Sequence, residues 1–367
     1  MSFLEIKRSY DNFDFDSFSK SVDADEIKKI LALPKISELQ FLSLLTPAAL
    51  PFLEDMATKA RSISIKHFGK SIVLFAPLYV SNFCINNCAY CGFSTRNNIE
   101  RKILSFEEVE ENAKIVAGFG IRHILLLTSE NPLKTPIEYL GKCVEILKKH
   151  FDAVDIEVYP LKENEYKELA RCGADGITIF QETYDEALYK TLHTKGPKSN
   201  YEFRLQTLER AGTMKYRNLN LGALLGLGDF SKEVFFAGLH AKYLQQNFPS
   251  SDVGISFPRI REAEGGYQPN TIISDAMLVE AMCAVRLFIN RIGITISTRE
   301  NNQLRKNLIP LGVTKMSAAS NTQVGGYAKQ NNTKGQFEIS DGSTVDEIKK
   351  MIYQKGYQPI MKDWQPL

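Results

Sequence analysis

The sequence has no strong charge excess, no long apolar run and few cysteines for its length, and each shortage excludes a class of protein. Its 45 Lys and Arg residues nearly balance 43 Asp and Glu residues, whereas a sequence-independent nucleic-acid binder carries a clear basic excess. No stretch approaches about 18 consecutive apolar residues, so we expect no membrane span. The first residues, MSFLEIKRSY, contain no uninterrupted apolar segment and do not form a secretory signal. We therefore expect a soluble, cytoplasmic protein that binds neither nucleic acid nor membranes.

The cysteines are few but unevenly placed. Three of the six fall within eight residues, at Cys84, Cys88 and Cys91. A cytosolic chain of 367 residues buries enough surface to fold without disulfides, so clustered cysteines point to a metal or to catalysis. The remaining three lie in apolar or helix-like contexts and are expected to pack in the core, as free cysteines commonly do. They are Cys143, Cys172 and Cys283.

The order of sequence patterns predicts an α/β barrel. Residues 1–70 form a helical extension, 71–330 the barrel and 331–367 a short C-terminal extension, and we expect both extensions to cover the barrel ends. Eight strand–helix units in about 250 residues are typical of a closed (β/α)8 TIM-type barrel, and open doubly wound sheets usually have fewer. The expected strands are 71–80, 123–128, 154–159, 176–180, 219–225, 252–257, 293–297 and 313–317. The expected helices between them are 105–119, 136–150, 163–172, 200–211, 231–246, 274–292 and 300–308.

Polar residues follow six of these strands, where the chain would otherwise pass into an ordinary loop. In a barrel of this kind the carboxyl ends of the strands meet at one mouth, and the chemistry lies there. Six polar strand ends that converge on one mouth are more than chance would place there. They are Cys84, Ser129-Glu130, Gln181-Glu182, Arg259, Arg299-Glu300 and Asn321.

The loop after the first strand carries the cysteine cluster with the spacing C-x3-C-x2-C. Three thiolates can hold three corners of a cubane iron–sulfur cluster and leave the fourth iron open for a substrate or cofactor. A structural zinc site would need a fourth ligand, and His123 lies on an expected strand without a partner. An iron–sulfur electron carrier would also need a fourth cysteine, and none is evident.

This spacing, with Tyr90 directly before the third cysteine, resembles the signature of the radical S-adenosylmethionine (radical SAM) superfamily. Further motifs resemble its aromatic amino acid lyase branch, most specifically the 2-iminoacetate synthase family, from about residue 70 to Trp364. One departure is the run Ile260-Arg-Glu-Ala-Glu264, where the family tends to have a proline. The motifs are LLTSE at 126–130, QETY at 181–184, H-x-x-GPK at 193–198, GALLGL at 222–227, SFPR at 256–259, STRE at 297–300 and S-x-T-x-x-GGY at 320–327.

The resemblance implies cofactors and a role for each site residue. A 4Fe-4S cluster would be held by Cys84, Cys88 and Cys91, with S-adenosylmethionine chelating the open iron. Glu130 would bind the cofactor's amino group, Glu182 and Arg204 its ribose or methionine part, and Tyr90 would lie beside it. Arg259 would hold the substrate carboxylate, with Ser256 next to it and Arg299 as a second positive charge. These roles follow from matched positions in the motifs and are expectations.

The implied reaction is radical cleavage of the Cα–Cβ bond of L-tyrosine to 2-iminoacetate and p-cresol, for the thiazole of thiamine. Because 2-iminoacetate hydrolyses readily, direct hand-over to a thiazole synthase partner is expected. An external one-electron reductant, a flavodoxin or ferredoxin with NADPH-derived electrons, would deliver electrons to the cluster. Two alternatives stay in the same branch, a tryptophan lyase and a hydrogenase-maturase-type tyrosine lyase. The maturase carries a second cysteine group in a C-terminal extension, and residues 331–367 contain no cysteine.

Overall fold

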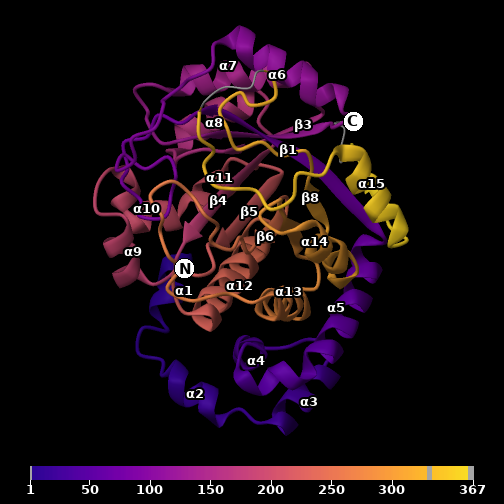
Figure 1. Cartoon of the computed structure of the whole chain (residues 1–367). Helices are drawn as coiled ribbons and strands as arrows, with labels where there is room; N and C mark the ends of the chain where they lie inside the picture. The colour runs from indigo at the N-terminus through magenta and orange to yellow at the C-terminus, as the bar shows by residue number, and fades with distance from the viewer. Residues whose placement is uncertain (1, 329–332, 363–367) are drawn as a thin grey trace.

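The computed structural model describes residues 2–328 and 333–362. Residues 363–364, where the resemblance to the family ends, lie outside these ranges. The centre of the molecule is one parallel sheet, in which β1 pairs with both β2 and β8 and so closes the first eight strands into a barrel (Figure 1). The predicted barrel is confirmed. Its strands are β1 (Ser71–Ser81), β2 (His123–Thr128), β3 (Ala153–Glu157), β4 (Gly176–Glu182), β5 (Asn218–Ala223), β6 (Asp252–Ser256), β7 (Gly293–Ile296) and β8 (Lys315–Ser317).

The first strand shows why the barrel sequence reads as an almost continuous apolar run. Alternate residues of β1, including Phe75 and Tyr79, face the interior of the barrel, while Leu74 and Leu78 are fully buried against the outer helices. A strand covered on both faces needs no polar side, which is the usual pattern of parallel sheets.

The outer helices follow the predicted order with two differences. The expected helix at 200–211 is divided at Gln206, and near the break the carbonyl of Phe203 accepts a hydrogen bond from the side chain of Arg210 at 2.6 Å. A short helix after β4 was not expected. The helices are α6 (Phe106–Gly118), α7 (Ile137–Leu147), α8 (Glu163–Arg171), α9 (Glu186–Leu192), α10 (Tyr201–Leu205), α11 (Thr207–Thr213), α12 (Phe230–Asn247), α13 (Asp275–Phe288) and α14 (Asn302–Leu308).

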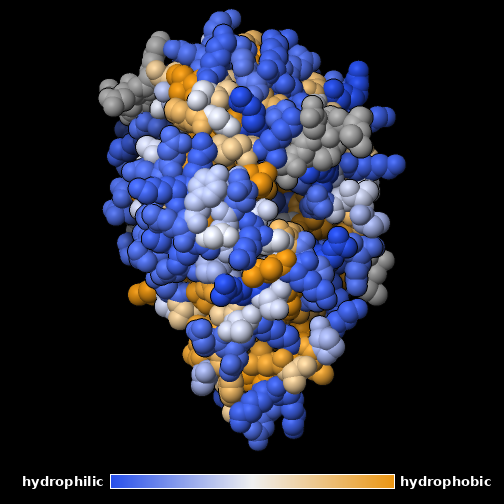
Figure 2. All heavy atoms as spheres, turned by 90° about the vertical axis from the view of Figure 1, so that its right-hand side faces the viewer, coloured by the Kyte–Doolittle hydropathy of each residue, from blue (hydrophilic) through white to orange (hydrophobic). Residues whose placement is uncertain are grey.

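The N-terminal extension is helical as predicted, but it does not cover a barrel end. It packs on the outer helices α12 and α13, where Phe41 stacks on Phe288 at 4.5 Å (Figure 1). Only the end of α5 reaches the base of the barrel. Figure 2 shows apolar surface gathered over this extension, where Leu39 and Leu50 are exposed. Its helices are α1 (Phe3–Arg8), α2 (Phe15–Ser21), α3 (Ala24–Ala32), α4 (Glu38–Ser43) and α5 (Leu53–Phe68), with a 3-10 turn at Pro47–Phe52.

The C-terminal extension contributes to the sheet itself. After α15 (Val345–Gln354), strand β9 (Gln358–Ile360) pairs in parallel with the start of β1, and the amide of Gln358 donates to the carbonyl of Lys70 at 2.7 Å. Ile360 lines the base of the barrel interior. Within residues 2–328 and 333–362, no helix is long and apolar enough to cross a membrane.

Candidate cluster and substrate site

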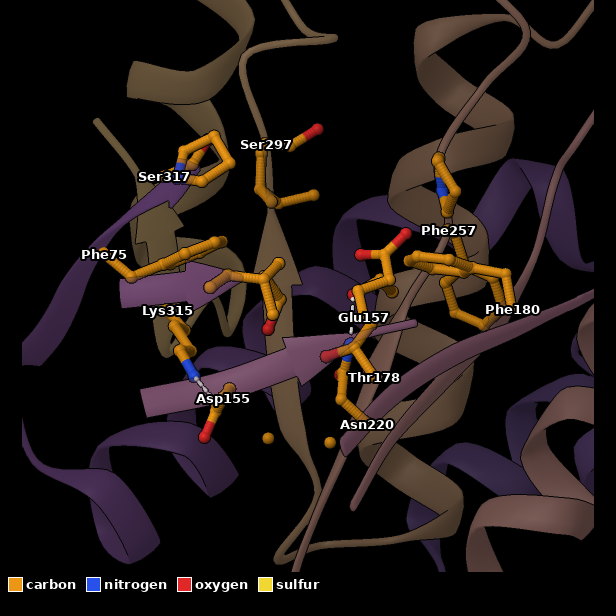
Figure 3. Close-up of a pocket in the computed structure, with 18 of the residues that line it drawn as sticks. Phe75, Asp155, Glu157, Thr178, Phe180, Asn220, Phe257, Ser297, Lys315 and Ser317 are labelled. Carbon is orange, nitrogen blue, oxygen red and sulfur yellow. Dashed lines mark hydrogen bonds and ion pairs between the residues drawn. The ribbon is translucent and has the colours of Figure 1, made fainter. Parts of the chain in front are cut away.

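A cavity of about 990 Å³ occupies the barrel interior. Its upper end is lined by Tyr90 and Cys91 of the loop after β1, and its lower end by His67 at the end of α5 and by Arg291. Ordinary barrels of this type are filled by packed layers of side chains. This one is hollow along its length, and Figure 3 shows inward side chains from several strands around the open space.

Two glycines help to open the lower half. A Cβ atom on Gly176 would lie 2.4 Å from Oδ1 of Asp155, and a Cβ atom on Gly254 would lie 2.7 Å from Oδ1 of Asn220. Real Cβ atoms do not approach other atoms so closely, so these positions need glycine to leave room for polar neighbours. The lower half is therefore both wide and polar.

The polar groups of the lower half pair with one another. Oδ2 of Asp155 lies 3.0 Å from Nζ of Lys315 and 2.8 Å from Nε2 of His123. Burial alone raises the pKa of Asp155, but the adjacent Lys315 and His123 outweigh it and hold that pKa well below its usual value. Asp155 is thus a satisfied carboxylate.

The cysteine loop at 82–105 has neither helix nor strand and is tied by one arginine. Arg101 donates to the carbonyls of Asn82, Phe93 and Ser94, each at 2.7 Å. Four hydrogen bonds from one guanidinium, including a fourth to Asn97, fix the loop without regular backbone structure. The irregular path lets all three cysteines lie near the barrel mouth.

The surroundings of the three thiols suit an iron–sulfur cluster. In the described part of the chain, no three His, Cys, Asp or Glu side chains are arranged to hold one metal ion. Side-chain amides of Asn86 and Gln336 lie 3.8 Å from the sulfurs of Cys84 and Cys91 and can donate to them. Three soft ligands with amide donors to sulfur are the donor set expected for an iron–sulfur cluster with one open iron.

Burial favours the protonated form of two of these thiols. It raises the pKa of Cys88 to about 12 and also raises the pKa of Cys91. Metal binding requires thiolates, so assembly of a cluster must release protons from these groups.

The cluster loop also contacts the residues expected to bind S-adenosylmethionine. Asn86 donates to Oε2 of Glu130 at 2.6 Å and accepts from the amide of Lys198 at 3.0 Å. The hydroxyl of Tyr90 lies 2.8 Å from Nε2 of His193. Tyr90 and Lys198 line the cavity, whereas Glu130 is buried just behind it.

Glu182 stands at a strained position at the end of β4. Its φ of 72° is in the left-handed region, which side chains rarely adopt, and such strain often marks functional sites. Its carboxylate pairs with Lys198 at 2.6 Å and with Arg204 at 3.3 Å. Burial opposes ionisation of Glu182, but these two cations keep its pKa below the usual value.

The residues expected to bind the substrate carboxylate do not all reach the cavity. Ser256, Arg261 and Arg299 line it, and Arg259 does not. The guanidinium of Arg259 binds Glu300 through two nitrogens, Asp275 at 2.8 Å and the carbonyl of Ile273 at 2.9 Å. Its donors are therefore used within the protein.

Arg299 is placed differently. Its guanidinium stacks over the ring of Phe337 at 3.4 Å and makes one long hydrogen bond, 3.3 Å, to the carbonyl of Arg259. With the other described residues its remaining donors make no hydrogen bond, and they face the cavity. Arg299 is thus the better placed of the two arginines for an incoming carboxylate.

Four polar cavity residues near the site had no role in the sequence analysis. Lys198 lies in the GPK motif and Arg261 in the departure after Arg259, and both are now seen at the mouth. Glu157 ends β3 and faces inward, and its signal was the alternation of Asp155 and Glu157 within a buried strand. Gln336, from the C-terminal extension, accepts a hydrogen bond from the Tyr79 hydroxyl at 2.9 Å, and its backbone carbonyl accepts one from the amide of Gly92 in the cluster loop at 3.2 Å.

Comparison with known proteins shows the family of the chain. The radical SAM superfamily model matches residues 78–235, and the Biotin and Thiamin Synthesis associated domain matches residues 256–358. The 2-iminoacetate synthase of Escherichia coli strain K12 is 36% identical over 342 residues, which cover 93% of this chain and 91% of that protein. The Salmonella typhimurium protein of the same name is 34% identical over the same coverage.

Solved structures give the same fold. HydG, a maturase of FeFe-hydrogenase, superposes with a TM-score of 0.90 at 30% identity, over 97% of this chain and 80% of that chain. HydG from Carboxydothermus hydrogenoformans gives a TM-score of 0.84 at 29% identity, over 98% of this chain and 82% of that one. The chain therefore belongs to the 2-iminoacetate synthase family of radical SAM enzymes, which implies a 4Fe-4S cluster and S-adenosylmethionine as its cofactors.

Proposed function

We propose that the protein cleaves the Cα–Cβ bond of L-tyrosine, yielding 2-iminoacetate and p-cresol. The observation that carries this proposal is the identity of 36% to a curated 2-iminoacetate synthase over 93% of the chain. The site supports it, because Cys91 of the three-cysteine loop, the charged residues Glu182 and Lys198, and aromatic side chains line the same deep cavity.

The cluster ligands in this proposal are Cys84, Cys88 and Cys91. When bound, the cluster and S-adenosylmethionine would supply one-electron radical chemistry that acts at the substrate amino group. Glu130, Glu182, Arg204 and Tyr90 bind the cofactor in this proposal, and Lys198 joins them, since it faces the cavity between Glu182 and the Tyr90 ring.

The substrate carboxylate binds Arg299, with Ser256 nearby on the cavity wall. A forked guanidinium suits a carboxylate, and holding it fixes the amino group relative to the cofactor. Arg259 then serves to fix Glu300 and the strand ends around the mouth. Depth within the barrel keeps bulk water from the labile imine.

Three further proposals concern the surroundings of the reaction. We propose that a flavodoxin or ferredoxin, with NADPH-derived electrons, reduces the cluster, that the protein works in the cytoplasm, and that 2-iminoacetate passes to a thiazole synthase. The chemistry of the product supports the last step, because an imine that hydrolyses in water gains from direct transfer.

The test is an anaerobic assay of reconstituted protein with S-adenosylmethionine, dithionite and either L-tyrosine or L-tryptophan. We expect p-cresol and glyoxylate, the hydrolysis product of 2-iminoacetate, from tyrosine only. The high TM-score to HydG favours one second candidate, a maturase-type lyase. Carbon monoxide or cyanide among the products would support that candidate, and tryptophan cleavage would overturn the tyrosine assignment.

A further inference from the structure

Glu157 is an inward carboxylate to which the proposed reaction has so far given no role. It is the last residue of β3, its side chain lines the cavity, and Figure 3 shows it among Thr178, Phe180 and Phe257. Among the described residues, its carboxyl group makes neither a hydrogen bond nor an ion pair. Because Glu157 is only partly buried and lines the cavity, its carboxyl oxygens are open to a ligand that brings a hydrogen-bond donor.

The other carboxylates of the barrel interior are already satisfied. Asp155 is held by Lys315, Glu182 by Lys198, and Glu300 by two arginines. Asp252 also lines the cavity, but it is exposed at the lower rim. Within residues 2–328 and 333–362, Glu157 is thus the enclosed carboxylate left for a ligand.

The depth of Glu157 in the barrel indicates which end of a bound amino acid it would contact. Ile156 pairs with Ile177, so Glu157 lies level with Thr178 on β4. Glu182, beside the cofactor wall, is four residues further up the same strand, so it lies nearer the mouth than Glu157, by less than the roughly 13 Å that four residues span along a tilted strand. The substrate amino group must lie at the upper level, near the cofactor, so Glu157 is at the level of the far end of the side chain.

The walls around Glu157 suit an aromatic ring. Tyr79, Leu127, Phe180 and Phe257 line the cavity around this space. Burial and the negative charge of Glu182 raise the pKa of Glu157 to about 7, while Arg299 acts in the opposite direction. A carboxyl group in this environment gains strongly from a hydroxyl donor.

From the placement of this unpaired carboxyl group below an aromatic wall, we propose that Glu157 accepts a hydrogen bond from the phenolic hydroxyl of the substrate. It thereby selects tyrosine over phenylalanine. This inference rests on the proposed function, since it assumes that tyrosine is the substrate. Glu157 would then be a specificity-determining residue that contacts the end of the substrate remote from the reacting bond.

The experiment measures equilibrium binding of L-tyrosine and L-phenylalanine by calorimetry to anaerobically reconstituted protein with S-adenosylmethionine and no reductant. A hydrogen bond to a charged group corresponds to a preference of roughly 10- to 150-fold for tyrosine in the wild type. Glu157→Gln should reduce this ratio several-fold, and Glu157→Leu should bring it close to one. Both variants should fold, because Glu157 makes no contact that its loss would break.

The matched control is Glu280→Gln. Glu280 is another buried carboxyl group with a raised pKa, about 8, but it lies on α13 and does not line the cavity. This variant should keep the wild-type ratio.

Two results would overturn the inference. An unchanged ratio in both Glu157 variants would remove the residue from the phenol site. An equal loss of affinity for both amino acids would place Glu157 at the ammonium group instead. Failure of the wild type to bind or cleave tyrosine would instead refute the proposed function, so the two failures are distinguishable.

Discussion

Replacing Arg259 or Arg299 by alanine should separate a structural arginine from a substrate-binding one. Glu300 is only 2% exposed, and Arg259→Ala removes the two guanidinium nitrogens that bind its carboxylate. Arg261, at 2.7 Å, is then the remaining partner of Glu300. Breaking a buried ion pair costs about 3–5 kcal/mol. The lost contact to Asp275 adds little, since the Asp275 side chain is 60% exposed. We expect a marked fall in the thermal midpoint.

Arg299→Ala should behave in the opposite way. It loses one long hydrogen bond and the stack on Phe337, together worth about 1–2 kcal/mol of stability. In this variant the carboxylate of bound tyrosine would lack a charged partner. That loss should weaken the binding free energy by about 2–5 kcal/mol. Tyrosine affinity should fall at least tenfold, while S-adenosylmethionine binding should persist because its residues lie on other strands.

The assay combines thermal unfolding of each protein with calorimetry of tyrosine binding. A second variant, Arg259→Ala with Glu300→Gln, removes the unpaired charge and should recover part of the stability. The reasoning fails if Arg259→Ala is as stable as the wild type but no longer binds tyrosine. In that case Arg259 is the carboxylate partner, as the sequence first indicated, and Glu300 must release it when substrate enters.

Three further predictions can be checked on the same protein. Alanine at Cys84, Cys88 or Cys91 should each abolish the brown cluster absorbance and most of the bound iron after reconstitution, whereas full iron in any of them would disprove that ligand. Serine at Cys143, Cys172 or Cys283 should leave iron content unchanged and cost about 1–3 kcal/mol where the site is fully buried, and iron loss there would reveal another metal site. Burial raises the pKa of Glu280 from 4.5 to about 8, so its contribution to stability is complete below pH 4.5 and is lost as pH rises toward 8. Glu280→Gln should therefore show its largest gain in thermal midpoint over the wild type near pH 8, and an equal difference at both ends of this range would contradict the assignment.

The barrel could be predicted from the sequence because its strands and helices differ in periodicity and alternate regularly. Strand β9 was missed, since three residues carry no periodicity and their pairing with β1 depends on a segment far away in sequence. The helix break at Gln206 was missed for a related reason. Near the break the Arg210 side chain reaches the carbonyl of Phe203, and local propensity does not record such a contact.

The cysteine ligands could be proposed from sequence because all three lie on one loop. The two arginines could not be distinguished, because both follow a strand and only tertiary neighbours decide their roles. Arg259 meets Glu300 and Asp275, whereas Arg299 meets an aromatic ring and open space. Glu157 was overlooked within an apolar strand, although two carboxylates at alternate positions indicate that the barrel interior is polar.

The pairing of β9 with the beginning of β1 has a consequence for synthesis on the ribosome. Ser71 emerges early, but its partner Gln358 follows all the other described strands of the barrel. Until then, the lower edge of β1 presents unpaired amide and carbonyl groups, which can recruit a strand from another chain. A nascent chain halted between β8 and β9 would thus expose this edge, and it should depend more on chaperones than the completed protein.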